Sequence, residues 1–411
     1  MFAQEGIGHR AWLPALVAVL LSGGAAEPET RTYALEVLPP EHRTMTDPET
    51  GAELTFLTTS DGQDTNLYFH ERSWLADGSM ILLYSDREKG GLMGYLVATG
   101  ELIRFQSPVG ALGRATAALQ GRRVFAMRGD DVLELSLSYA ISEDPHQEPS
   151  TVTVDERTIA TLPEGGSSTA LNENCDGTWL AVSSSHYAHL DGPGIIVVNV
   201  ATGEGRDVCR AGEPNVRDSH VQWSHTDPHL LSFAGVAQRL WVIDVRDGRP
   251  RNVYVQRPGE LVTHEHWWVR TPAGDEQIVF CGGLHPKPTE DSHVKVVNVR
   301  TGEVRILGAG SWWPEGTPAE ISKRNYWHCA GSDDGHWVAA DNWHGDITLF
   351  EGKTTRARTL TTKHRTYGGG AHPHVGWDRR GEQVVFTSHK LGSPDVCIAT
   401  IPQAWQDDNP S

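Results

Sequence analysis

Cationic residues are scarce in this sequence. Its 411 residues include 35 Lys and Arg against 53 Asp and Glu, which gives a formal net charge of −18. A protein that binds nucleic acid needs clustered cations to neutralise phosphates, so this balance argues against a nucleic-acid partner. A small anionic substrate stays compatible with it, provided that a local group of cations or a metal opposes the overall field.

Paired cysteines and several familiar catalytic motifs are also missing. The five cysteines show no CxxC spacing and their number is odd, so we expect most of them to be packing residues. No G-x-S-x-G, Walker or H-E-x-x-H motif is present. Serine-hydrolase, nucleotide-binding and zincin chemistry therefore have no support in the sequence.

Long apolar runs are missing as well. The run from Ala11 to Leu21 is too short to cross a membrane, which takes roughly 20 residues. A basic flank at residues 9–10 precedes it and small residues at 22–26 follow it, which is the pattern of a secretory signal peptide. The polar segment that comes next favours export over the alternative, a buried helix. We therefore expect residues 1–26 to be a signal peptide and residues 27–411 to form one periplasmic or secreted domain without a membrane span.

What the sequence does contain is a repeat. A tight turn centred on Gly, or once on Pro, is followed by an alternating apolar strand, and this unit recurs seven times. The turns are Asp77-Gly78, Gln120-Gly121, Asp176-Gly177, Asp227-Pro228, Ala273-Gly274, Asp334-Gly335 and Arg380-Gly381. No segment shows a sustained helical period, and the spacing resembles that of propeller blades, which repeat about every 40 to 50 residues. Sandwiches do not repeat one hairpin unit in this way. The sequence therefore predicts an all-β fold, a seven-bladed β-propeller.

Closure of the ring involves both ends of the chain. The last unit has only about three strands after His374, ending at residues 396–401. The stretch from Ala52 to Thr58 precedes the first full blade and has strand character. We predict that it supplies the outer strand of the last blade and that the closed ring is a monomer.

The 20 histidines are unevenly placed within the repeat. Seven of them lie seven to ten residues before the turn of their own blade: His70, His220, His264, His266, His328, His372 and His374. In a propeller this is where the innermost strand begins, and equivalent positions face the channel at the same end. Five of the seven blades are thus predicted to direct an imidazole to one mouth of the channel.

This grouping points to a metal. Residues two apart in a strand share a face, so His372 and His374 should point the same way, as should His264 and His266. Imidazole is the commonest protein ligand for divalent transition metals. A lone histidine at such a position would more often be a hydrogen-bonded structural residue, but packing alone would not select histidine at one position in five blades.

At this point the sequence resembles the oligogalacturonate lyases, seven-bladed propellers that act on pectin fragments. The resemblance runs from Asp47 to the C-terminus. It is carried by Asp47-Pro-Glu-Thr-Gly51 with Leu57-Thr58, by Thr263-His264-Glu265, and by His372-Pro373-His374 followed by Val385-Phe386-Thr387-Ser388.

The resemblance implies a manganese site and assigns residues to it. The family's metal-binding histidines correspond to His264, His372 and His374, while Gly369 stands at the position of the family's glutamine ligand. We take His328 as the candidate for the missing ligand, with His266 as the alternative. Zinc and calcium stay open as alternatives to manganese.

The resemblance also implies the catalytic groups. His220, seven residues before Asp227, matches the family's base, and Arg239 matches a family arginine that we expect to recognise a substrate carboxylate. His70 and His266 complete the predicted set as substrate-binding residues.

The implied reaction is β-elimination on a 4-linked uronide, with an acidic oligosaccharide as substrate. A metal on the carboxylate acts as a Lewis acid, and a neutral histidine takes the C5 proton. Two other functions stay open. One is a non-catalytic periplasmic propeller that binds a protein or glycan, and the other is a metal-dependent hydrolase or a lyase for another uronate such as glucuronan.

Overall fold

The computed structural model describes residues 30–165, 168–210, 220–284, 292–307, 325–364 and 372–408. The predicted signal peptide, residues 1–26, lies outside these ranges and stays a prediction.

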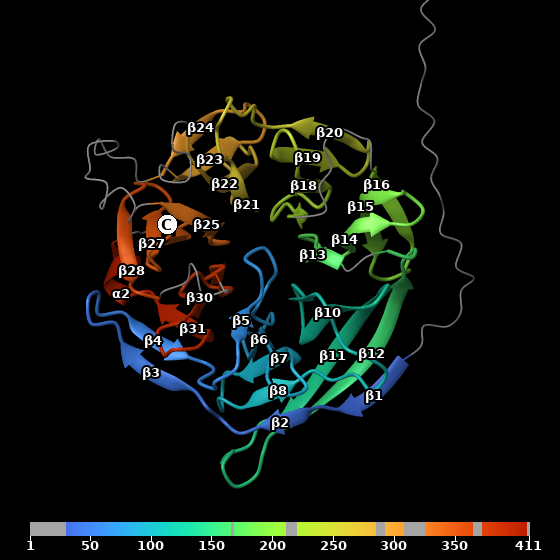
Figure 1. The fold of residues 1–411 in the computed structure, drawn as a ribbon, viewed down its shortest axis with the longest axis vertical. Helices are drawn as coiled ribbons and strands as arrows, with labels where there is room; N and C mark the ends of the chain where they lie inside the picture. Colours follow the sequence, from blue (N-terminus) through green and yellow to red (C-terminus); the bar gives the residue numbers. More distant parts are fainter. Residues whose placement is uncertain are drawn as a thin grey trace, which may run out of the picture.

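Seven antiparallel sheets surround a central channel, which confirms the predicted seven-bladed β-propeller (Figure 1). From the channel outward, the four strands that each of the first four blades contributes are β5 (Asp64–Asn66), β6 (Met80–Ser85), β7 (Gly91–Leu96) and β8 (Leu102–Arg104) in blade 1; β9 (Ala115–Ala117), β10 (Arg123–Arg128), β11 (Asp131–Ala140) and β12 (Thr151–Thr161) in blade 2; β13 (Ser168–Glu173), β14 (Trp179–Tyr187), β15 (Gly192–Asn199) and β16 (Gly205–Arg210) in blade 3; and β17 (Gln222–Trp223), β18 (Leu230–Ala234), β19 (Leu240–Asp244) and β20 (Arg249–Asn252) in blade 4.

The other three blades follow the same pattern. Their strands are β21 (Thr263–Trp267), β22 (Gln277–Gly282), β23 (His293–Asn298) and β24 (Val304–Ile306) in blade 5; β25 (Tyr326–Gly331), β26 (Trp337–Asn342), β27 (Ile347–Glu351) and β28 (Ala357–Thr361) in blade 6; and β29 (Gly376–Trp377), β30 (Gln383–Ser388) and β31 (Asp395–Thr400) in blade 7.

The predicted turns join the first two strands of each blade because their residues suit the required backbone. Gly335 between β25 and β26 has φ +75°, and a Cβ there would lie 2.8 Å from Cγ2 of Val269 in blade 5. Glycine adopts this conformation without a steric penalty and lets the neighbouring blade approach closely.

The N-terminal segment closes the ring as predicted and also does more. Strand β4 (Glu53–Phe56) pairs with β31 in blade 7, within the predicted range 52–58. It is not the outermost strand, because β3 (Arg43–Thr46) pairs outside it. Two further strands, β1 (Thr30–Ala34) and β2 (Glu36–Leu38), add fifth strands to blades 2 and 1. One continuous segment therefore links blades 7, 1 and 2 (Figure 1).

Closure by β4 leads to a stability prediction. Phe56 is fully buried and packs with Phe386 and Cys397 of blade 7. Truncation of a buried phenylalanine costs about 3–5 kcal/mol. We expect Phe56→Ala to lower the free energy of unfolding by this amount, measured by urea denaturation. The matched change Val97→Ala, at a side chain that is 47% exposed, should change it by less than about 0.5 kcal/mol. Equal stability of the two variants would contradict closure by β4.

A short loop interrupts the innermost strand of blade 1. After β5 the chain turns away over residues 67–72, and strand pairing resumes where Leu82 N donates to Ser73 O. The ring of Phe69 lies about 6 Å from those of His220, His264, His266 and His328, which come from blades 4, 5 and 6. The loop therefore reaches into the middle of the channel, where Figure 1 shows it after β5. His70 lies on this loop and not at the start of a strand.

The C-terminal helix and the cysteines complete the fold. The described chain ends in α2 (Gln403–Asp407), and none of its helical structure has the length and apolarity needed to cross a bilayer. Cys281, Cys329 and Cys397 are buried, free thiols, as expected of packing residues, and Cys175 is free and partly exposed.

Candidate active site and metal centre

Three predicted histidines form a group with metal-ligand geometry. The nitrogen atoms that His328, His372 and His374 can offer all lie within 4.8 Å of one another. His328 belongs to β25, where the pairing with β26 shifts register between Tyr326 and Cys329. Such a bulge redirects a side chain. The two other rings come from the segment just before β29.

The hydrogen bonds of His328 fit a metal ligand. Its Nδ1 lies 2.8 Å from Asp341 Oδ2, and both side chains are fully buried. An ionised carboxylate only accepts, so Nδ1 carries the proton and Nε2 has a free lone pair. That Nε2 is buried without a hydrogen-bond partner. A carboxylate that orients the second nitrogen of a ligating histidine is the usual arrangement at zinc and related centres. The donor set therefore fits a divalent transition metal.

His264 lies beside this trio without joining it. Its ring centroid is 4.1 Å from that of His328, but its Nδ1 lies 2.9 Å from the Thr263 hydroxyl. The trio of mutually close ligand atoms does not include it. The structure thus brings together three of the four predicted ligands, with His328 in the group and His264 next to it. Gly369 lies outside the described residues.

His220 lies next to His264, with ring centroids 5.5 Å apart, and near two groups that were not among the predicted site residues. Its Nε2 is 3.1 Å from the Tyr68 hydroxyl, and its Nδ1 is 3.6 Å from Glu265 Oε1. Glu265 is itself fully buried and accepts a hydrogen bond of 2.9 Å from Nε of Arg239. Asp227, which the spacing had paired with His220, instead lies near Arg270 at 3.8 Å.

Arg239 is therefore connected to the site by Glu265, which lies between its guanidinium and His220. Its Nη2 is buried and has no hydrogen-bond partner. An unsatisfied guanidinium donor inside a protein costs free energy unless a ligand accepts from it. This donor is available for an anionic ligand.

The remaining two predicted residues lie apart from the trio. His70, on the channel loop, has both ring nitrogens buried without a hydrogen-bond partner, and its ring is 5.5 Å from that of His220. His266 does not contact the trio, since its ring lies 4.9 Å from His225 and lines a separate cavity described below. The alternative that gave His266 the missing ligand position has no support in this geometry.

The histidines of the site are kept neutral. Burial, followed by the charge of Arg239, holds the pKa of His220 well below its usual value. Burial also lowers the pKa of His328 and of His374, and neighbouring imidazoles add to the effect. Neutral imidazole is the form that ligates metals and accepts protons.

Backbone strain marks the same positions. His220, His264 and His374 have φ of +61°, +52° and +49°. Non-glycine residues in this region cost about 1–3 kcal/mol each and gather at functional sites. Each of these histidines is followed three residues later by tryptophan, in His220-Val-Gln-Trp223, His264-Glu-His-Trp267 and His374-Val-Gly-Trp377. This repeated H-x-x-W pattern is a sequence signal for the histidines with positive φ, and the spacing of the turns alone does not reveal it.

No family model matches the chain. Two curated proteins are similar to it: an oligogalacturonide lyase of Pectobacterium atrosepticum, 23% identical over 404 residues that cover 89% of this chain and 98% of that protein, and an oligogalacturonate lyase of Dickeya dadantii, 22% identical over 231 residues that cover 52% and 56%. The chain is thus similar in sequence to oligogalacturonate lyases, as the motif resemblance predicted. The match to the first protein extends over almost the full length of both chains, so it includes all seven blades.

Solved structures of oligogalacturonate lyases share the fold. One from Vibrio parahaemolyticus superposes with a TM-score of 0.68 at 19% identity and covers 91% of this chain and 100% of its own. Another, in complex with manganese, has a TM-score of 0.69 at 18% identity and covers 90% and 99%. The propeller fold is thereby confirmed.

Proposed function

We propose that this protein is a lyase that cleaves 4-linked uronides, oligogalacturonate first among them, by metal-assisted β-elimination. The observation that carries the proposal is the position of His220, a buried histidine whose pKa is held well below its usual value by burial and by Arg239 and which lies outside the group of three histidines that could hold a metal. The relatedness to oligogalacturonate lyases supports the same reaction.

The protein's own groups fit three tasks of that reaction. His328, His372 and His374 would hold the metal, and manganese is the ion that we propose, because a similar structure contains it. When bound, a divalent cation on the substrate carboxylate makes the adjacent C–H more acidic by Lewis-acid withdrawal. Arg239 Nη2 offers a further donor to that carboxylate.

His220 takes the C5 proton in this scheme. The Glu265 carboxylate lies 3.6 Å from Nδ1, beyond hydrogen-bond length, and its charge favours the tautomer with the proton on Nδ1 and with Nε2 as the basic nitrogen. In the free protein the Tyr68 hydroxyl occupies Nε2. Substrate would replace that hydroxyl with its own C–H. As His220 takes the proton, the C–H electron pair forms the C4=C5 double bond, the C4–O4 bond breaks, and the leaving O4 oxygen takes up a proton from water or a second side chain. A base within hydrogen-bond reach and mostly neutral at working pH is what general-base catalysis requires.

The decisive assay exposes purified, manganese-loaded protein to a panel of uronide oligomers that includes oligogalacturonate and glucuronan fragments. We expect ultraviolet absorbance of an unsaturated uronate to rise with oligogalacturonate. A rise with glucuronan alone would reassign the substrate. New reducing ends without absorbance would indicate a hydrolase, and tight glycan binding without either product would indicate a binding protein.

The proposed location rests on the N-terminal pattern alone. We place the activity in the periplasm or outside the cell, with a monomeric enzyme. Fractionation of a strain that expresses the full chain, together with mass determination of the mature N-terminus, tests both the export and the cleavage near residue 26.

A further inference from the structure

A second cavity lies further along the channel, beyond the loop that carries Phe69 and His70. Its volume is about 60 Å³. In β25 the metal-group residue His328 is followed by Ala330 and Gly331, which line this cavity, and His374 is followed by Gly376 and Trp377, which line it too. Successive strand residues advance about 3.3 Å each. Phe69 and His70 also line the cavity, so the channel loop separates it from the metal group.

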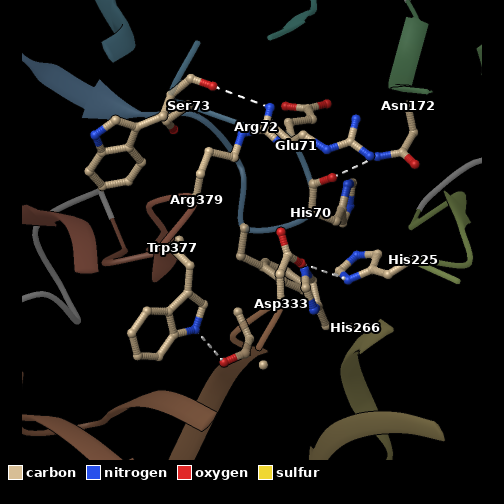
Figure 2. A pocket seen from close by; sticks show the side chains of 15 residues that line it. His70, Glu71, Arg72, Ser73, Asn172, His225, His266, Asp333, Trp377 and Arg379 are labelled. Carbon is tan, nitrogen blue, oxygen red and sulfur yellow. Dashed lines mark hydrogen bonds and ion pairs between the residues drawn. The ribbon is translucent and has the colours of Figure 1, made fainter. Parts of the chain in front are cut away.

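Two arginines from different blades meet at this cavity. Figure 2 shows Arg72, which follows the channel loop of blade 1, and Arg379, which follows β29 of blade 7. Arg72 Nη2 donates to Glu173 O at 3.1 Å, and Arg379 Nη2 donates to Ala118 O at 3.1 Å. Each guanidinium is therefore anchored on one side by a backbone carbonyl, which fixes the direction of its other donors.

The carboxylates of Glu173 and Asp333 act on both arginines, yet one guanidinium nitrogen is left without a hydrogen bond. Arg72 Nη1 is buried without a hydrogen-bond partner, and the nearest carboxylate oxygen, of Glu173, is 3.5 Å away. Burial, followed by the charge of Arg72, lowers the pKa of Arg379 to about 10. Buried guanidiniums that repel each other are stabilised by an anion between them.

The size and access of the cavity limit the ligand. A water needs about 10–15 Å³ of such space, so about 60 Å³ has room for four to six oxygen-sized atoms. Arg72, His225 and Asp333 also line a wider pocket of about 220 Å³, which extends the cavity. Asp333 is exposed at this rim, 3.3 Å from His225 (Figure 2).

We propose that this cavity is a binding site for a small oxyanion of the sulfate or phosphate type, held by Arg72 and Arg379. The fork of an arginine matches two oxygens of such an ion, and charge-assisted hydrogen bonds of this kind are among the strongest in proteins. The site is distinct from the metal group, and it neither supports nor requires the proposed lyase activity.

Sulfate is the probe of choice, because phosphate precipitates manganese. Isothermal titration calorimetry of the manganese-loaded protein in a chloride-free buffer should show one saturable site. We expect Arg72→Gln and Arg379→Gln each to weaken sulfate at least about tenfold. Arg380→Gln is the matched control, since Arg380 is exposed and pairs with Glu382 at the surface. It should leave the affinity unchanged.

Two further variants separate a binding site from a purely structural role. Asp333→Asn removes a negative charge from the rim and should increase the affinity for sulfate severalfold. A purely structural role of the arginines, in which they only hold neighbouring blades together, would not produce this increase. His374→Ala should leave sulfate affinity unchanged, whereas its loss would place the ion at the metal and overturn the proposal. If the glutamine variants fail to fold, Arg72→Lys and Arg379→Lys keep the charge but lose the fork, and unchanged affinity in both would also overturn it. Absence of saturable sulfate binding to the unmodified protein has the same consequence.

Discussion

Replacing His374 with Ala is expected to strip the divalent metal from the protein and to lower uronide-lyase turnover by at least about 10²-fold. His374 is one of three rings whose ligand nitrogens lie within 4.8 Å of one another. Two histidines alone hold such an ion far more weakly than three. The measurements are metal content after dialysis against manganese, by mass spectrometry, and the initial rate of unsaturated-product formation.

His336→Ala is the matched control, because His336 is a partly exposed histidine of blade 6 that lies 3.5 Å from Asp334. It should keep both metal and activity. Asp341→Asn tests the orientation of His328 and should weaken metal binding about 10- to 100-fold without removing a ligand. If His264→Ala loses its metal while His328→Ala retains it, the ligand set is the one that the family resemblance implied and not the trio.

Sequence reasoning succeeded where the signal is local. Each blade has a turn residue such as Gly335, which has a positive φ, followed by an apolar strand. The number of blades could therefore be counted from the sequence. It failed on partners that are distant in sequence. Strand β1 pairs with β12 across more than a hundred residues, and alternation along a strand does not specify which sheet edge it joins.

The channel loop was missed for a related reason. Tyr68 and Phe69 have the residue types of a strand and follow β5 directly, so nothing local indicates that they leave it. They turn inward because histidine rings from four other blades pack around them. His220 and His374 are two of these histidines. The prediction that His70 begins a strand at the mouth is therefore wrong, because His70 lies on the loop.

The candidate site shows the same division. A position in the repeat was enough to gather His328, His372 and His374, because equivalent positions of a propeller share one channel end. The position in the repeat could not show which histidines bind the metal, because ligation depends on which ring nitrogen is free. That depends on neighbours such as Asp341, which lies on β26, and Thr263. In the sequence Glu265 was only the last residue of the Thr263-His264-Glu265 triplet, yet it lies between Arg239 and His220.

Replacing His220 with Ala is expected to lower turnover by about 10²-fold or more while leaving metal content intact. His220 lies outside the metal trio, and its pKa is held well below the usual value by burial and by Arg239. The nearby Glu265 carboxylate favours the tautomer in which Nε2 accepts a proton once substrate displaces the Tyr68 hydroxyl. Loss of this base removes the proton acceptor but no ligand. Steady-state kinetics on oligogalacturonate and metal analysis of the same preparation measure both effects.

Two variants around His220 separate chemistry from positioning. Tyr68→Phe removes the hydroxyl that lies 3.1 Å from Nε2 but keeps the ring, and Glu265→Gln keeps the shape while it removes the charge between His220 and Arg239. Both should retain more activity than His220→Ala. Glu265→Gln should also raise KM, because Arg239 loses the partner that aims it at the substrate. Full activity in His220→Ala would transfer the base to another mouth residue, with His70 first among the candidates. Lost metal in that variant would instead make His220 a ligand, and the division of the histidines into ligands and base would then be wrong.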